Sequence, residues 1–365
     1  MKRIQDLKRS QLNHLKPYIP GTPVDEVRRE LGLKRVTKMA SNENAFGASP
    51  KAVEAIRRYA ESVYQYPESG CFYLRDALAS RLELKPEQLI FGNGSDELIT
   101  LMYRAFISPG DEVLVASPTF LIYEIAAQIA GAKIVSVPLK NWRYDLEAMK
   151  AAVNKRTKLV FFANPDNPSG SYFTKNEFES FMQDLPKDLL IFMDEAYFEF
   201  APKEDFPDVL NWIRKHPILV SRTFSKAYGL AGLRIGYGMA DKDMIQALDQ
   251  VREPFNVNLL AQIGGLAALR DRSHLSLTLR LTHQGKQYLY EEFEKLGIDF
   301  VPSATNFVMF RVKEPAKQLA RRILMKGIII RDLGAWDLPG CLRVTVGSCA
   351  ENERFIRVLK QEMRA

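Results

Sequence analysis

Short apolar runs alternate with amphipathic stretches between residues 88 and 240. The runs are nearly continuous in apolar residues, as expected for strands buried on both faces of a sheet. The stretches between them, such as SDELITLMYRAF, indicate helices, with Ser95 and Thr174 as N-caps. This alternation predicts an α/β fold whose mostly parallel, seven-stranded sheet is flanked by helices on both faces. The apolar runs lie at 88–94, 111–118, 132–139, 158–165, 189–197, 218–224 and 235–240.

The pattern changes after about residue 255. Long helical patterns over 259–296 precede shorter apolar strands at 306–312, 327–333 and 341–347. This order is typical of a smaller α+β domain, which we expect the N-terminal residues to join. A chain of 365 residues suits one large and one small domain. We therefore predict a large domain at 39–255 and a small domain made of 1–38 plus 256–365.

Composition and charge narrow the possible partners. The chain is 46% hydrophobic and 26% charged, and no apolar run approaches the about 20 residues of a membrane span. The basic start, MKRIQDLKRSQLNHL, lacks the apolar stretch of a secretory signal, so we expect a cytoplasmic protein without a membrane partner. The net charge of +7 is spread without long basic blocks, which disfavours nucleic acid and fits small anions.

The cysteines and histidines predict neither disulfides nor a metal site. The three cysteines include no CxxC pair, which favours reduced thiols. The four histidines show no spacing typical of metal ligands.

Candidate chemistry lies directly after the apolar runs, because ligands of open α/β sheets gather at the carboxyl ends of the strands. The first run leads into GNGSDE (92–97), where glycines permit close backbone approach and a helix begins that can hold a phosphate. A plain glycine turn fits this stretch equally well. Neither GxGxxG nor a ribose-binding acid is evident, which disfavours a dinucleotide site. Phe120, after the second run, fits either ring stacking or core packing.

The later runs add an amide, a carboxylate, an amine and a guanidinium. NPDNPSG (164–170) forms a turn that presents Asn167, and Asp194 ends the next run. A carboxylate at the mouth of a buried strand is costly unless a cationic or protonated group pairs with it. The last stretch, SRTFSKAYGLAGLRIGYG, brings Lys226 and Arg234. Together these groups describe a socket for pyridoxal phosphate, whose aldehyde, ring nitrogen, phenolic oxygen and phosphate each need such a partner.

Over nearly its whole length the chain resembles the fold-type I pyridoxal-phosphate aminotransferases, and most closely the histidinol-phosphate aminotransferase family. Several motifs in the right order carry this resemblance. They are LKPYIPG (15–21), SNENAFG (41–47), YQYP (64–67), GNGSDE, NPDNPSG, MDEAYFEF (193–200), TFSKAYGLAGLRIGY (223–237) and GCLRVTVG (340–347).

The resemblance implies a role for each cofactor-side residue. Lys226 would form the Schiff base, and Asp194 would pair with the pyridine nitrogen. Tyr197 and Asn167 would hydrogen-bond the ring oxygen, and Phe120 would stack on the ring where relatives often have tyrosine. The cofactor's phosphate would be held by Gly94, Ser95, Asp96, Thr223, Ser225 and Arg234.

The resemblance also implies the substrate side and the assembly. Arg343 would hold the substrate's anionic group, and Arg331, Tyr18 and Asn44 match other substrate-side positions. Tyr66 matches a residue that reaches into the neighbouring subunit's cofactor and substrate site, which implies a homodimer.

Two stretches make the substrate's identity the open question. The family's usual NENPYG is NENAFG here, with Ala45 and Phe46, and relatives vary in RDLGAWDLPG (331–340). We expect both stretches to line the substrate pocket.

The expected reaction is transamination of histidinol phosphate with 2-oxoglutarate, giving imidazole acetol phosphate and glutamate in histidine biosynthesis. An aromatic amino acid aminotransferase and a phosphothreonine-type decarboxylase of the same fold stay open as alternatives. A nicotinamide-dependent oxidoreductase is disfavoured by the missing GxGxxG. A non-catalytic binding protein is disfavoured because Lys226 and Asp194 are both present.

Overall fold

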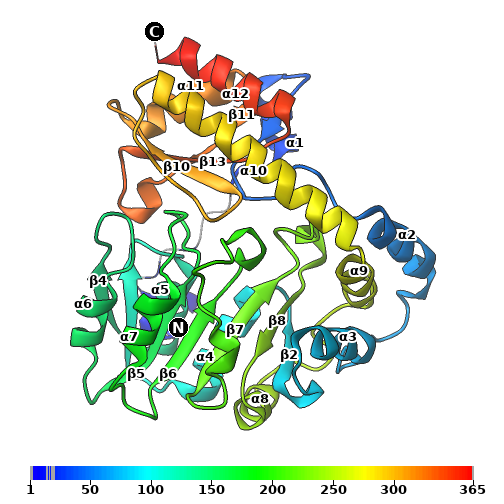
Figure 1. The fold of residues 1–365 in the computed structure, drawn as a ribbon, viewed down its shortest axis with the longest axis vertical. Coiled ribbons are helices and arrows are strands. Elements are labelled where there is room, and N and C mark those ends of the chain that lie inside the picture. The colour runs from blue at the N-terminus through cyan, green and yellow to red at the C-terminus, as the bar shows by residue number, and fades with distance from the viewer. Residues whose placement is uncertain (1–2, 14, 16, 18–20, 364–365) are drawn as a thin grey trace.

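In the computed structural model, which describes residues 3–13, 15, 17 and 21–363, seven strands form one large sheet (Figure 1). Their order is β2-β8-β7-β6-β5-β3-β4, and all run parallel except β8, which is antiparallel to both of its neighbours. This confirms the predicted mostly parallel sheet. The strands are β2 (Leu89–Gly92), β3 (Glu112–Ser117), β4 (Lys133–Pro138), β5 (Thr157–Ala163), β6 (Leu190–Asp194), β7 (Ile218–Thr223) and β8 (Gly236–Met239).

Helices cover both faces of this sheet, because successive residues of each buried strand point to opposite sides. Phe161 of β5 packs in one core and its neighbour Phe162 packs in the other. The first core is closed by α4 (Ser95–Phe106), α5 (Ile122–Ala130) and α8 (Lys242–Asp249). The second is closed by α2 (Pro50–Tyr59), α3 (Phe72–Leu82), α6 (Leu146–Ala152), α7 (Lys175–Met182) and α9 (Leu259–Arg270).

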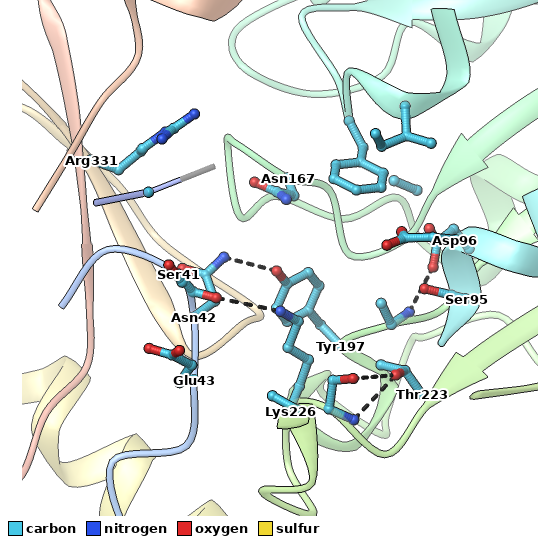
Figure 2. A pocket seen from close by; sticks show the side chains of 18 of the residues that line it. Ser41, Asn42, Glu43, Ser95, Asp96, Asn167, Tyr197, Thr223, Lys226 and Arg331 are labelled. Carbon is cyan, nitrogen blue, oxygen red and sulfur yellow. Dashed lines mark hydrogen bonds between the residues drawn. The ribbon is translucent and has the colours of Figure 1, made fainter. Parts of the chain in front are cut away.

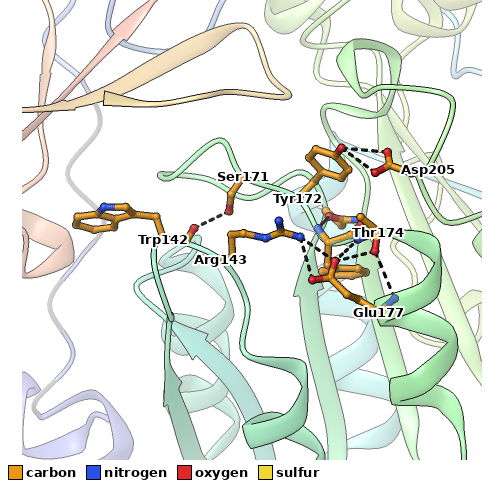
Figure 3. A network of polar contacts seen from close by, with 9 residues as sticks. Trp142, Arg143, Ser171, Tyr172, Thr174, Glu177 and Asp205 are labelled. Carbon is orange, nitrogen blue, oxygen red and sulfur yellow. Dashed lines mark hydrogen bonds and ion pairs between the residues drawn. The ribbon is translucent and has the colours of Figure 1, made fainter. Parts of the chain in front are cut away.

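The predicted cap of α7 is confirmed, but the predicted burial of β4 is not. Thr174 caps α7 as predicted, in a capping box with Glu177, whose carboxylate also accepts a hydrogen bond from Arg143 (Figure 3). The expectation that every strand is buried on both faces was wrong for β4. This strand lies at the edge of the sheet, and most of its residues are partly or fully exposed.

The smaller part of the molecule contains a second, four-stranded sheet of order β12-β13-β10-β9. Its strands are antiparallel, and the long helix α10 packs across them with two further helices (Figure 1). The elements are β9 (Phe300–Val301), β10 (Phe307–Arg311), β12 (Arg331–Asp332), β13 (Cys341–Thr345), α10 (Arg272–Lys295), α11 (Ala316–Met325) and α12 (Cys349–Glu362).

The N-terminal segment joins this smaller part only in its later residues. Strand β1 (Thr37–Lys38) pairs in parallel with β11 (Ile328–Ile329), and α1 (Val24–Leu31) packs beside that pair. An earlier residue lies elsewhere, since Arg9 donates a hydrogen bond to the carbonyl of Ile129 at the end of α5.

Two contacts differ from what the expected domain limits would give, and the limits stay a prediction. The start of the N-terminal segment contacts the large domain through α5. Helix α9, expected in the small domain, packs in the core of the large sheet through Ala261, Ala268 and Leu269. Within the described residues, no helix is both long and apolar enough to cross a membrane.

Candidate active site

A cavity of about 380 Å³ opens where the carboxyl ends of the large sheet face the smaller domain. Figure 2 shows Ser95, Asp96 and Thr223 on the opposite side of this cavity from Arg331, with Tyr197 and Lys226 between them. The structure thus brings most of the sequence-predicted site together. The predicted residues in the cavity wall are Ser95, Asp96, Phe120, Asn167, Asp194, Tyr197, Thr223, Ser225, Lys226, Arg234, Arg331 and Arg343.

Lys226 lies in the turn after β7 and presents its amine to the cavity, whose wall also contains Lys38. Its side chain is half-buried, and its Nζ donates a hydrogen bond of 3.5 Å to the carbonyl of Ser41. Burial lowers the pKa of Lys226 from 10.5 to about 8, and the positive charge of Arg343 acts in the same direction. A much larger fraction of this amine is therefore neutral, and nucleophilic, at pH 7 than for an ordinary lysine.

Asp194 is the last residue of β6 and is buried, with 5% of its surface exposed. Its Oδ2 accepts a hydrogen bond of 2.8 Å from the hydroxyl of Tyr123, and its Oδ1 accepts one of 3.0 Å from the N–H of Ala196. Burial raises the pKa of Asp194 from 3.8 to about 7, although both hydrogen bonds oppose the shift. A cationic partner in the cavity would favour the charged form of this carboxyl and oppose the effect of burial.

Two polar side chains lie between the amine and the smaller domain. The Tyr197 hydroxyl accepts a hydrogen bond of 2.8 Å from Asn42 Nδ2, and burial raises the pKa of Tyr197 to about 12. The hydroxyl therefore keeps its proton at neutral pH and remains a donor. The amide oxygen of Asn167 accepts a hydrogen bond from Arg343, which links the turn after β5 to β13 of the smaller sheet.

The far side of the cavity is a cradle suited to a phosphate. Gly94 precedes α4 with φ +75° and ψ −179°, a backbone conformation that is essentially limited to glycine. The Thr223 and Ser225 hydroxyls are 3.0 Å apart in the next strand-end turn. Hydroxyls, an arginine and the N-terminus of a helix are the donors that bind phosphate in proteins. The donor set therefore fits the phosphate of pyridoxal phosphate.

Four sequence-based expectations at this site need correction. Ser95 is the first residue of α4 rather than its N-cap, which is Gly94. Asn44 does not line the cavity, because its amide donates to the carbonyl of Ala227 and its oxygen accepts from the N–H of Phe46. Ala45 and Phe46 also do not line it.

Tyr66 lies outside the cavity of its own chain. It is 84% exposed, and its ring stacks on Phe255 with the ring centroids 4.9 Å apart. Tyr18 lies outside the described residues.

Three residues that the sequence reasoning missed also shape the cavity: Asn42, Tyr123 and Trp336. Asn42 lies in the SNENAFG motif, two positions before Asn44. Tyr123 follows Phe120 by three residues, at the start of α5. Trp336 lies in the stretch RDLGAWDLPG, which is expected to line the substrate pocket.

Comparisons with known proteins agree with this geometry. The family model for "Aminotransferase class I and II" matches residues 34–359. The histidinol-phosphate aminotransferase of Moorella thermoacetica is 44% identical over 97% of this chain and 92% of that protein. Histidinol-phosphate aminotransferase 2 of Carboxydothermus hydrogenoformans is 44% identical over 96% of this chain and 98% of its own length.

The crystal structure of the histidinol-phosphate aminotransferase from Sinorhizobium meliloti, solved with pyridoxal-5'-phosphate, is 31% identical and superposes with a TM-score of 0.89. This match covers 96% of this chain and 98% of that one. The fold and the matches first define the class, a pyridoxal-phosphate-dependent aminotransferase of class I and II. Within that class, the chain belongs to the histidinol-phosphate aminotransferase family.

Proposed function

We propose that this enzyme transfers the amino group of histidinol phosphate to 2-oxoglutarate, giving imidazole acetol phosphate and glutamate. The observation that carries the proposal is a single cavity in which an amine and a buried carboxylate lie between a phosphate cradle and two arginines. The cradle suits the cofactor's phosphate, and the two arginines line the other side of the cavity, where a guanidinium suits the substrate's own anion. The names of the relatives support this choice of substrate.

When bound, pyridoxal phosphate supplies an aldehyde that takes up the amino group and a ring that withdraws electrons from the substrate's α-carbon. Lys226 is the residue that we assign to bond that aldehyde in the resting enzyme. When it is not bonded to the cofactor, its neutral Nζ would accept the proton of the substrate's α-carbon and would be able to donate it again. Its lowered pKa suits this exchange, because the neutral amine accepts a proton near pH 7.

We assign the ring environment to Asp194, Tyr197, Asn167 and Phe120. The Asp194 carboxylate, held in place by the hydroxyl of Tyr123 and the N–H of Ala196, would keep the ring nitrogen protonated. Tyr197 would donate to the ring oxygen. Phe120 lines the cavity beside Tyr123 and would supply an aromatic face for the ring.

We assign binding of the substrate's anionic group to Arg343 and Arg331, which lie opposite each other on β13 and β12. A guanidinium donates parallel hydrogen bonds to two oxygens, which suits both a carboxylate and a phosphate. An aminotransferase must seat both of its substrates in turn. One arginine pair can receive the phosphate of histidinol phosphate and then a carboxylate of 2-oxoglutarate.

We further propose that the active form is a homodimer in which Tyr66 enters the partner's site. Exposed aromatic side chains support this, because exposed apolar surface on a soluble protein marks interfaces. Tyr66 stacks on Phe255, and Phe72 packs edge-on against Tyr73, and all four rings are exposed. We also propose that the enzyme is located in the reducing cytoplasm. Cys71, Cys341 and Cys349 are all free thiols, which agrees with this location.

A substrate panel tests the proposed reaction directly. Purified protein loaded with pyridoxal phosphate is assayed with histidinol phosphate, phenylalanine, tyrosine and O-phosphothreonine, with 2-oxoglutarate as the amino acceptor. We expect the largest kcat/KM for histidinol phosphate. A larger value for the aromatic amino acids, or carbon dioxide release from O-phosphothreonine, would assign the site to one of the two alternatives instead.

A further inference from the structure

Trp336 connects the smaller sheet to the large domain at the substrate side of the cavity. It ends a short helix, Gly334–Trp336, in the loop between β12 and β13, and only 5% of its surface is exposed. Its Nε1–H donates a hydrogen bond of 2.9 Å to the carbonyl of Thr119, the neighbour of Phe120. The indole therefore has a fixed orientation and lies in the cavity wall.

The same indole faces the two arginines of the substrate side. Arg331 and Arg343 are direct partners in the antiparallel ladder of β12 and β13, so their side chains leave the same face of the sheet. Like charges that lie directly opposite each other repel. The guanidinium carbons of Arg331 and Arg343 are 5.2 and 5.9 Å from the Trp336 ring centroid, within range of attraction by the ring's electrons.

A second connection ties this arrangement to the large domain. The Thr119 hydroxyl donates a hydrogen bond of 2.8 Å to Asp166, a fully buried carboxylate. The next residue, Asn167, accepts a hydrogen bond from Arg343. The contacts thus close a ring from Trp336 through Thr119, Asp166 and Asn167 to Arg343, and back to Trp336. Arg343 also donates a hydrogen bond of 2.9 Å to the carbonyl of Ala40 and lies 4.9 Å from the ring centroid of Phe307, so the indole is one of several contacts that set its position.

We propose that Trp336 is a positioning residue that holds Arg331 and Arg343 as a pair for the substrate's anionic group. Its ring offsets the repulsion between the two guanidiniums, and its N–H, bonded to the carbonyl of Thr119, fixes the ring against the large domain. Trp336 therefore helps the enzyme to select substrates that carry a phosphate or carboxylate group in addition to the reacting amine. The inference rests on the proposed function.

Anion binding by the cofactor-loaded enzyme tests this without requiring turnover. The probes are inorganic phosphate and succinate, a dicarboxylate that cannot react, and calorimetry gives their dissociation constants. The variants are Trp336→Phe, which keeps an aromatic face but loses the N–H, and Trp336→Leu, which loses both. Trp212→Phe is the matched control, because Trp212 packs on Phe178 and does not line this cavity.

We expect the dissociation constants to rise about tenfold in Trp336→Leu and about threefold in Trp336→Phe, and to stay unchanged in the control. KM for the anionic substrates should rise in the same order while kcat changes less, and the cofactor's visible absorbance should be retained. Unchanged dissociation constants in both variants would overturn the inference. Equal losses in both would refute a role for the aromatic face. Failure to transaminate histidinol phosphate, with graded anion binding, would contradict the proposed substrate alone.

Discussion

Replacing Asp194 with asparagine gives the most informative perturbation of the site, because it changes charge with little change of shape. In the apo protein the amide oxygen can still accept from the N–H of Ala196, and the amide nitrogen can donate to the hydroxyl of Tyr123. Both contacts survive in the variant, and only the ionisable group is lost. The stability of the apo enzyme should therefore respond to pH differently in the two proteins.

The magnitude follows from the pKa of the buried carboxyl. Burial raises the pKa of Asp194 from 3.8 to about 7, and each unit corresponds to about 1.4 kcal/mol of unfolding free energy. A raised pKa means that the folded state holds the proton more tightly than the unfolded chain. The stability contributed by the protonated carboxyl is complete below about pH 4 and is lost as pH rises through about 7. By pH 8 the loss is about 4 kcal/mol in the wild type and absent in the variant.

Urea unfolding from pH 5 to pH 8.5, at one protein concentration and without cofactor, measures this difference. We expect Asp194→Asn to gain stability over the wild type as pH rises. With saturating pyridoxal phosphate the order should reverse, since only the wild-type carboxylate can pair with the protonated ring nitrogen. Parallel pH curves for the two apo proteins, or equal stabilisation of both by the cofactor at pH 8, would refute this account of Asp194.

Three further predictions concern the amine, the anion site and the subunit exchange. The rate at which the apo enzyme captures pyridoxal phosphate should rise with pH around a midpoint of about 8, because burial lowers the pKa of Lys226; stopped-flow absorbance would show a midpoint near 10.5 if it did not. Arg343→Ala should raise KM for both substrates by about 100-fold, whereas steady-state assays with unchanged KM would exclude the residue from anion binding. Mixing inactive Lys226→Ala and Tyr66→Ala subunits should restore about a quarter of wild-type activity, since half of the dimers are mixed and each has one intact site. No recovery on mixing would place Tyr66 in its own subunit's function or in none.

The strands of the large sheet could be predicted because their signal is local. A buried strand needs a run of apolar residues, and β5, β6 and β7 show such runs directly before the polar residues of the site. Since the carboxyl ends of parallel strands lie at one edge of the sheet, the sequence alone predicts that Asn167, Asp194 and Lys226 lie close together. The antiparallel direction of β8 has no such signal, because a short buried strand has the same composition in either direction.

The substrate side could not be derived in the same way, because it depends on register and on distant contacts. Tyr123 reaches Asp194 across 71 positions of sequence, and nothing in the helix around Tyr123 marks that contact. Arg331 and Arg343 become a pair only through the alignment of two short strands. The contact of Trp336 with both arginines could not be predicted without knowing that they are paired. The roles of the site residues and the domain limits stay predictions.

The central claim is that the ε-amine of Lys226 is the group that binds the cofactor covalently. The most direct measurement is reduction of the pyridoxal-phosphate-loaded protein with borohydride, followed by proteolysis and mass spectrometry of the peptides. The account predicts that the cofactor's mass stays attached to Lys226 and to no other lysine. An unmodified Lys226 peptide from fully loaded protein, or attachment at another lysine, would contradict it.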